Sequence, residues 1–447
     1  MHVKSINLNS LIDRIDANFY VSRAEVIEGF DKEYNVLGRI CDFPRAKTPP
    51  RELYFKSGVP VIKLKNVTEY FLQLKDTDYL PEDNYKLYVQ PKVGDILVTA
   101  TGEGTIGRVG IFEKDIKCIV TGEVMIIRTK EENPYFLFAY LRSPHCRYQL
   151  EKYARGSTGQ THLYSKDVSL IPILKVSKDI RDKTEKLVKE AIQKKLLADD
   201  RYKEAETKLC KTLGIDKINI NFNKSFEASS KDVMAVMRFD SEYFQPKYRK
   251  IIELLRRSNL KVNLLKDCVL PKNRRVDPRK DPSNNFIYIE IGDIDITNGE
   301  IYYKKIYGYE APPNARKRVK TGDILLSKVR PTRGAITIIP DNLDDAVSSS
   351  AFYICRPRED FLSEFLFLYL RSDLALTQFG QPIAGSMYPT IKDEGVENIL
   401  VPVIPKKEQT QIANLIKEYF ILCKESRLLL DKASSSLFLS LRLEEKR

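Results

Sequence analysis

The feature that most constrains this chain is an internal repeat. Residues 136–143 read FLFAYLRS, and residues 365–372 read FLFLYLRS, so the two segments differ at a single position. One such match can arise by chance, but five in the same order predict two copies of one structural unit within 447 residues. The other four pairs keep nearly the same spacing and begin at Arg14 and Arg238, Lys92 and Lys320, Gly156 and Gly385, and Ile171 and Val401.

Each copy is expected to fold into a mixed unit of helices and strands. Period-2 alternation at residues 61–65 and 288–291 predicts strands. Both copies also place a Gly-Asp turn before an apolar run, at residues 94–98 and 322–326, which predicts a further buried strand in each. The FLF-x-YLRS segments are apolar nearly all round and therefore predict short buried helices.

A long helix is predicted at the end of each copy, over about residues 178–212 and 406–445. From Ile180 to Leu209 and from Ile412 to Leu441, core positions keep a 4-3 spacing with polar residues between them. This pattern favours a coiled coil in which the two helices pair. At ~1.5 Å per residue, each helix is roughly 50–60 Å long. The alternative is an amphipathic helix that lies on its own domain.

The charge of the chain points to a polyanionic partner. It carries 74 Lys and Arg against 61 Asp and Glu, a formal net charge of +13. This favours nucleic acid, although a lysine-rich proteome would give the same balance. The first residues lack the apolar core of a signal peptide, and no stretch approaches the length of a membrane span. The seven cysteines are scattered without a C-x-x-C pair, so we expect a reduced, cytoplasmic protein.

Three motifs give the chain a family resemblance. They are the Gly-Asp-Ile-Leu turn followed by a glycine-rich loop (TGEGTIGRVG, residues 101–110), a Gly-Ser loop (GSTGQT, residues 156–161), and a Pro-x-x-Glu-Gln-x-x-Ile segment at residues 405–412. Together they resemble the specificity (S) subunit of type I restriction–modification systems. The first copy departs from the Glu-Gln signature at residues 176–180, and the second glycine loop is reduced to KVRPTRG at residues 328–334.

The resemblance implies an α+β fold. Two repeated α/β target-recognition domains would be separated by two long antiparallel helices with pseudo-twofold symmetry. We place the first recognition domain at residues 1–176, the central helical spacer at 177–225, the second recognition domain at 226–405 and the distal spacer at 406–447. The resemblance further implies double-stranded DNA as ligand, two methyltransferase subunits and then restriction subunits as partners, and S-adenosylmethionine and ATP on those partners only.

Enzymatic motifs are missing or weak. There is no Walker P-loop, and the glycines of residues 102–107 lie between two β runs rather than at the start of a helix, as a dinucleotide site requires. Asn133-Pro134-Tyr135 is similar to a methyltransferase motif but lacks one proline, and a helix N-cap followed by proline explains it. We therefore predict a non-catalytic subunit. A stand-alone DNA-binding regulator and an enzyme with an unfamiliar site are the alternatives.

Phosphate contacts need basic, hydroxyl and amide groups, and such groups gather in segments shared by the two copies. Base specificity is expected where the copies differ, at about residues 43–60, 66–90, 270–286 and 295–318. Two basic runs, residues 272–275 and 316–318, either track the DNA backbone or solubilise loops. The candidate DNA-binding residues are Lys63, Lys65, Thr101, Thr105, Arg108, Arg155, Ser157, Thr158 and Gln160 in the first copy, and Lys328, Arg330, Arg333, Ser386 and Tyr388 in the second.

Overall fold

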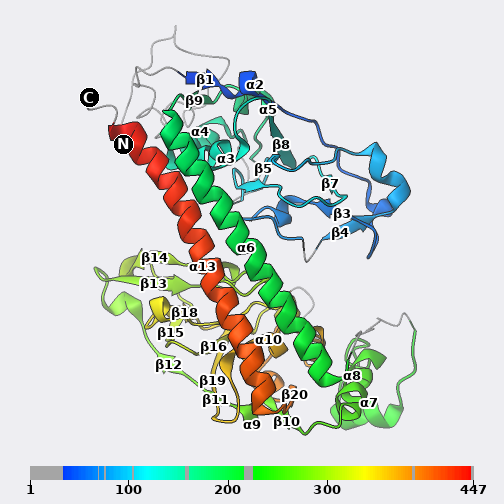
Figure 1. Cartoon of the computed structure of the whole chain (residues 1–447). Helices are drawn as coiled ribbons and strands as arrows, with labels where there is room; N and C mark the ends of the chain where they lie inside the picture. The colour runs from blue at the N-terminus through cyan, green and yellow to red at the C-terminus, as the bar shows by residue number, and fades with distance from the viewer. Residues whose placement is uncertain are drawn as a thin grey trace. The chain divides into compact units, whose positions relative to one another are not determined.

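The computed structural model describes residues 34–68, 70–74, 77–102, 105–156, 161–215, 225–384 and 388–443. The chain divides into two compact units. Unit 1 comprises Met1–Lys195 with Cys423–Arg447, and unit 2 comprises Leu196–Leu422. The boundaries fall inside the two longest helices, α6 (Lys178–Leu213) and α13 (Lys406–Leu443), so each unit contains one part of each helix (Figure 1).

Unit 1 is built on three small sheets. An antiparallel sheet has the order β2 (Cys41–Asp42), β8 (Val124–Thr129), β5 (Ile96–Thr99), β6 (Val109–Ile111). A second has the order β4 (Asp78–Leu80), β3 (Val59–Ile62), β7 (Ile119–Val120), with β3 and β7 parallel, and β1 (Tyr34–Val36) pairs with β9 (Pro172–Leu174). Its helices are α2 (Leu37–Ile40), α3 (Pro134–Arg142), α4 (Pro144–Tyr153) and α5 (Ser165–Val168), with 3-10 turns η3 (Arg51–Leu53), η4 (Leu64–Asn66) and η5 (Glu82–Leu87).

Strand β5 shows why the segment after the Gly-Asp turn is apolar throughout. Its alternate residues Ile96 and Val98 join the core beneath α3, whereas Leu97 joins a second core that includes Ile126 of β8. Both faces of the strand are therefore buried, so period-2 alternation disappears. Helix α3 starts as expected, because Asn133 Oδ1 accepts hydrogen bonds from the N–H groups of Tyr135 (2.9 Å) and Phe136 (3.1 Å).

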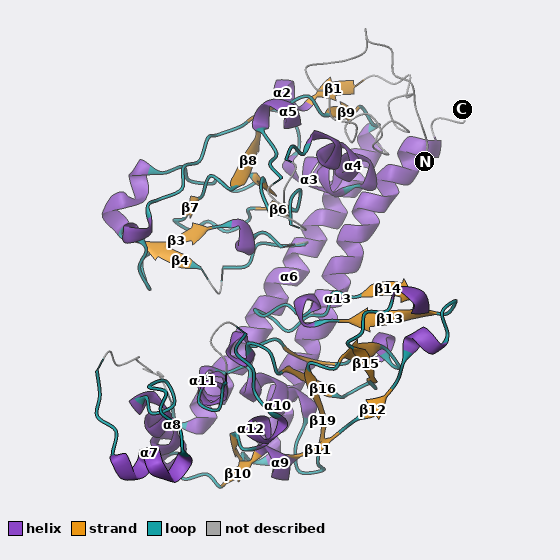
Figure 2. Ribbon diagram, turned by 180° about the vertical axis from the view of Figure 1, so that it is seen from behind, coloured by secondary structure: helices purple, strands orange, loops and turns teal. Residues whose placement is uncertain are grey.

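Unit 2 repeats this topology (Figure 2). In its two-stranded sheet, β10 (Val262–Leu264) pairs with β20 (Leu400–Pro402). Its four-stranded sheet has the order β11 (Val269–Pro271), β19 (Phe352–Pro357), β16 (Ile324–Ser327), β17 (Ile336–Ile338). Its five-stranded sheet has the order β12 (Arg274–Arg275), β15 (Ala315–Arg318), β18 (Val347–Ser349), β13 (Asn285–Ile289), β14 (Lys304–Tyr307). Its helices are α7 (Ser230–Val236), α8 (Pro246–Arg257), α9 (Leu265–Cys268), α10 (Ser363–Leu370), α11 (Asp373–Gly380) and α12 (Asp393–Glu397), with 3-10 turns η6 (Pro278–Lys280), η7 (Ile291–Asp293), η8 (Gly308–Glu310), η9 (Pro331–Arg333) and η10 (Asp341–Leu343).

The predicted repeat is confirmed as a repeat of strand order. The sheet β2-β8-β5-β6 corresponds to β11-β19-β16-β17, and the parallel pair β3·β7 corresponds to β13·β18. Helices α6 and α13 begin at Lys178 and Lys406, which are matching places in the two copies. The second copy adds two strands, β12 and β15, within segments that were expected to differ. The mixed fold with two repeated units and two long helices is thus confirmed, whereas the pseudo-twofold symmetry and the four segment boundaries stay predictions.

The two long helices pair, as the 4-3 spacing predicted. In unit 1, Ser426 Oγ donates to the carbonyl oxygen of Ala191 (2.6 Å), and Lys194 Nζ lies 2.8 Å from Glu425 Oε2. From Ala191 to Lys194 the residue numbers increase along α6, whereas the numbers of their partners in α13 decrease. The two helices therefore run antiparallel there. In unit 2, the rings of Tyr202 and Tyr419 meet edge to face with centroids 5.1 Å apart. No helix within the described ranges is long and apolar enough to cross a membrane.

Helix α4 contains a histidine that should make unit 1 sensitive to acid. His145 is 2% exposed and lies edge-on to the Tyr140 ring, and burial lowers its pKa to about 4. Between pH 6.5 and 4 the unfolded chain binds a proton that the folded chain does not, so stability must fall as the pH falls. We predict that His145 contributes up to about 3 kcal/mol to this loss.

The measurement is urea unfolding of the wild-type chain and of His145→Leu at pH 7 and pH 4.5. The variant is expected to lose less stability than wild type between these two values, whatever its stability at pH 7. Equal losses in the two proteins would mean that His145 does not titrate abnormally.

Candidate nucleic-acid interface

In unit 2, two of the predicted loops lie side by side. Val329 and Ala384 both form antiparallel bridges to Thr390. The Ile391 N–H donates to the carbonyl oxygen of Lys328 (2.9 Å), and the Arg330 N–H donates to that of Pro389 (2.7 Å). The loop after β16 and the two flanks of the Gly-Ser loop are therefore hydrogen-bonded into one surface. We call the surface formed by residues 328–334, 384 and 388–391 the second platform.

Unit 1 contains the same arrangement. Thr101 and Arg155 both bridge to His162, and the Leu163 N–H donates to the carbonyl oxygen of Ala100 (2.8 Å). His162 thus occupies the place in the first copy that Thr390 occupies in the second. We call residues 100–102, 105–108, 155 and 161–163 the first platform. The predicted contact residues Ser157, Thr158, Gln160 and Ser386 lie outside the described residues, as does the Arg14 motif.

The glycine-rich loop of the first platform lies between β5 and β6, and its described residues include Gly102 and Thr105. Gly102 has a φ of +99°, and a Cβ added there would lie 2.5 Å from Thr105 Oγ1. The Thr105 hydroxyl donates to the Gly102 carbonyl oxygen (3.3 Å), and the Thr99 hydroxyl donates to the carbonyl oxygen of Thr105. The positive φ therefore favours glycine at this position. The loop leads into a strand, as the sequence predicted.

Three arginines of the platforms present guanidinium groups that are not engaged. Within the part of the chain that the structure describes, Arg108, Arg330 and Arg333 form no side-chain hydrogen bond or ion pair. Arg330 also has a left-handed backbone, with φ 48° and ψ 52°, at the start of η9. Cationic side chains without a protein partner, fixed on a hydrogen-bonded surface, are suited to bind phosphate oxygens or guanine edges.

Other predicted contact residues already have acidic partners. Lys63 Nζ lies 2.6 Å from Asp78 Oδ2 and 3.7 Å from the centroid of the Tyr54 ring. Lys328 Nζ lies 2.8 Å from Asp393 Oδ1, and Arg155 pairs with Asp167. A phosphate would have to compete with these carboxylates. The remaining two predicted contact residues are Lys65, which lies in η4, and Tyr388, which is 67% exposed.

The basic runs of the second copy have a role that neither interpretation anticipated. Arg274 Nη1 lies 2.6 Å from Asp323 Oδ2, and Arg316 Nη1 lies 2.6 Å from Asp277 Oδ2, where hydrogen bonds from Arg316 and Arg279 hold the pKa of Asp277 at about 2. Lys317 donates to the carbonyl oxygen of Phe352 (2.7 Å), and burial lowers its pKa. These cations contribute to the fold.

Sequence reasoning missed one exposed aromatic pair. The rings of Tyr307 and Tyr309 stack with centroids 5.5 Å apart and an interplanar angle of 11°, and they are 42% and 67% exposed. They lie in the segment 295–318, where the copies were expected to differ. The Tyr-Gly-Tyr sequence was the signal that could have indicated this pair. The glycine between the two tyrosines is needed for space, since a Cβ on Gly308 would clash with the carbonyl oxygen of Asp281.

The profile of the family described as "Type I restriction modification DNA specificity domain" matches residues 31–195 and 258–427. The type I restriction enzyme HindI specificity subunit of Haemophilus influenzae is 31% identical over 148 residues, which are 32% of this chain and 31% of that protein.

Two solved structures are also similar. One is the HsdS subunit from Thermoanaerobacter tengcongensis, with 32% identity, coverage of 40% of this chain and 46% of that chain, and a TM-score of 0.33. The other is a type I S subunit from M. genitalium, with 14% identity, coverage of 93% and 95%, and a TM-score of 0.39. The chain thus spans less than half the length of the HindI subunit and of the first of these structures.

The family profile matches twice, and its two matches together cover more than half of the chain. The first match lies within unit 1 up to Lys195, and the second begins in unit 2 and ends in α13. The resemblance that the three motifs predicted is confirmed: this chain belongs to the family of type I restriction–modification DNA specificity proteins.

Proposed function

We propose that this chain is the sequence-specific DNA-binding subunit of a type I restriction–modification complex and has no catalytic activity of its own. The observation that carries the proposal is the duplicated platform, which keeps the two bridges to His162 or Thr390 in both copies while its side chains differ between them. Identical domains read identical half-sites, so two diverged copies should read two different ones. The target is then split and asymmetric, with one unit for each half.

The proposal includes the partners that such a subunit serves. Double-stranded DNA is the ligand, two methyltransferase subunits and then restriction subunits assemble on the chain, and S-adenosylmethionine and ATP are bound by those subunits. The chain would work in the cytoplasm, where its target DNA lies. The HindI relative is a specificity subunit of a type I restriction enzyme, which supports this assignment.

The test is selection of bound duplexes from a randomised pool by the purified full chain. We predict two different short motifs at a fixed separation, and binding that weakens with a steep log–log slope as salt rises. With several phosphate contacts, affinity should fall at least about tenfold between roughly 50 and 200 mM salt.

The alternatives give other results. One continuous motif, with no methylation of the selected site when the partner methyltransferase is present, would indicate a stand-alone regulator. Methylation, cleavage or ATP hydrolysis that stays with the chain through further purification would make it an enzyme. Methylation profiles of cells that contain the chain and its methyltransferase should give the same split target as the selection.

A further inference from the structure

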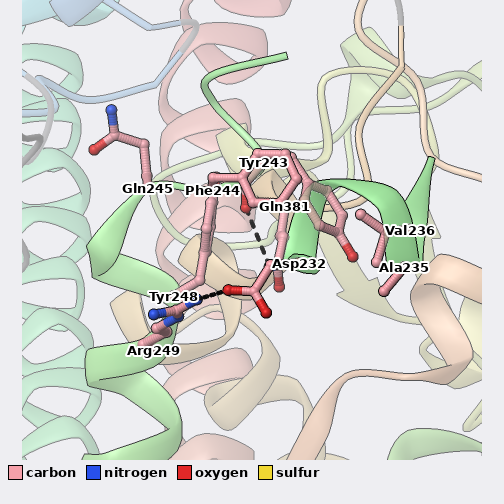
Figure 3. A pocket seen from close by; sticks show the side chains of 9 residues that line it. All are labelled: Asp232, Ala235, Val236, Tyr243, Phe244, Gln245, Tyr248, Arg249 and Gln381. Atoms are coloured by element: carbon pink, nitrogen blue, oxygen red, sulfur yellow. Dashed lines mark hydrogen bonds and ion pairs between the residues drawn. The ribbon is translucent and has the colours of Figure 1, made fainter. Parts of the chain in front are cut away.

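One repeated motif lies outside the second platform in unit 2. Arg238-Phe239-Asp240 with Tyr243 matches Arg14-Ile15-Asp16 with Phe19 in the repeat. In unit 2 it lies between α7 and α8, beside a pocket that Figure 3 shows, where the side chains of Tyr243 and Gln381 line the wall. A motif that recurs in both copies needs a role in the unit that is repeated.

Arg238 forms a clasp on the chain that follows α11. Its Nη2 donates to the carbonyl oxygen of Ile383 (2.8 Å), and its Nη1 donates to that of Gln381 (3.4 Å). Its Nε lies 2.8 Å from Asp240 Oδ2, and its guanidinium carbon lies 4.5 Å from the centroid of the Tyr243 ring. The bidentate, planar guanidinium suits this set of partners better than a lysine ammonium would.

The contact is reciprocated by the other segment. Gln381 Nε2 donates to the carbonyl oxygen of Tyr243 (3.2 Å), as Figure 3 shows, and the Tyr243 N–H donates to Asp240 Oδ1 (3.1 Å). We call Arg238, Asp240, Tyr243 and Gln381 the arginine clasp. It joins residues 238–243 to residues 381–383 through hydrogen bonds in both directions, so each segment fixes the position of the other.

The clasp ends where the second platform begins. Ile383 precedes Ala384, which exchanges two backbone hydrogen bonds of 3.0 Å with Thr390. Pro389, next to Thr390, accepts the hydrogen bond from the N–H of Arg330. A displacement of residues 381–383 should therefore displace, through these backbone hydrogen bonds, the loop that presents the unpaired guanidinium of Arg330.

The clasp contributes little to the hydrophobic core. Met237 and Phe239, the two neighbours of Arg238, are 72% and 79% exposed, and helix α7 before them has no buried residue. None of Arg238, Tyr243 and Gln381 belongs to a hydrophobic core of the described residues, so removal of the Arg238 side chain should open no core cavity. Its consequence should be a shift of the second platform rather than general unfolding.

We propose that Arg238 is a positioning residue that sets the geometry with which the second platform discriminates its half-site. The inference rests on the proposed function. In this proposal the Arg-x-Asp motif affects DNA recognition by holding the second platform in place, and Arg238 itself does not contact DNA.

The experiment compares Arg238→Ala with Arg249→Ala in the full chain. Arg249 lines the same pocket and pairs with Asp232 at 2.8 Å, but it makes no contact with residues 381–383 among the interactions of the described residues. The probes are the duplex selected by the wild-type chain and two derivatives, each with the bases of one half-site replaced. The half-site that unit 2 binds is identified with Arg333→Ala, as the half-site at which this variant loses discrimination.

We expect Arg238→Ala to reduce discrimination at that half-site about tenfold, a magnitude equal to a large part of one base contact, and to leave the other half-site within twofold. Arg249→Ala should retain both. Unchanged discrimination in Arg238→Ala, or equal losses at both half-sites, would overturn the proposal. If Arg238→Ala melts well below wild type, discrimination between the selected duplex and its two derivatives is measured with Arg238→Lys instead, and the same outcomes apply. A wild-type chain that discriminates neither half-site would instead refute the proposed function.

Discussion

Replacement of Arg128 by methionine is expected to lower the free energy of unfolding of unit 1 by about 3–5 kcal/mol. Asp95, the aspartate of the Gly-Asp turn, is 2% exposed, and its Oδ2 lies 2.7 Å from Arg128 Nη2. This is the only ion pair of Asp95 within the described residues. Without it, a carboxylate is left buried beside β5 with a single backbone donor, the N–H of Lys92 (2.7 Å).

The second copy provides a matched control. Asp323 is fully buried and pairs with both Arg356 (2.8 Å) and Arg274 (2.6 Å). Arg356→Met therefore leaves one arginine in place, and the loss should be only about 1.5–3 kcal/mol, as for a hydrogen bond to a charged group. The double variant with Arg274→Met should lose more than the sum of the two single variants, because only then is the carboxylate uncompensated.

Both effects can be measured by urea unfolding followed by circular dichroism, since the chain has no tryptophan. Amide hydrogen exchange in β5 and β16 would show which unit is affected. Additive losses in the second copy, or a cost for Arg128→Met no greater than for Arg356→Met, would show that the number of arginine partners does not set the stability.

The second large effect is expected at Arg330. Arg330→Ala and Arg330→Gly both remove the guanidinium, so each should weaken binding of the selected duplex about tenfold and reduce the salt slope by about 1. They should differ in stability. The left-handed backbone of residue 330 costs a non-glycine residue roughly 1–2 kcal/mol, so only the glycine variant relieves it.

Duplex titrations at several salt concentrations and thermal unfolding separate the two quantities. We expect Arg330→Gly to be at least as stable as Arg330→Ala and to bind equally weakly. Arg249→Ala, which removes one exposed charge elsewhere in unit 2, should keep wild-type affinity. Wild-type binding by Arg330→Gly would place the DNA surface away from the second platform.

Much of the fold could be predicted because the same local patterns recur in both copies of the repeat. The Gly-Asp turns, the buried FLF-x-YLRS helices and the seam of the long helices are local patterns. The role of particular polar groups could not be predicted, because their partners lie far along the chain. Tyr140, for example, accepts a hydrogen bond from the N–H of Leu174 (3.0 Å), and Asp95 needs the register of β5 against β8 to reach Arg128.

The candidate site was predicted less completely. The sequence indicated which loops carry basic and hydroxyl groups, but it did not predict that His162 and Thr390 join two loops in each unit. It also could not separate engaged from unengaged cations. Arg108 and Arg155 look alike in sequence, yet only Arg155 has an aspartate beside it, because Asp167 is brought there by α5.

The placement of the unit boundaries inside α6 and α13 has a consequence for the order of synthesis. Unit 2 is a continuous stretch from Leu196 to Leu422, so a ribosome that has passed Leu422 has made everything this unit contains. Unit 1 must wait longer, because Leu430, Ala433 and Leu437 belong to the same core as Leu37 and Ile96. The part of the chain that is translated first is therefore completed last, and a frameshift between codons 423 and 437 would damage the unit at the opposite end of the gene.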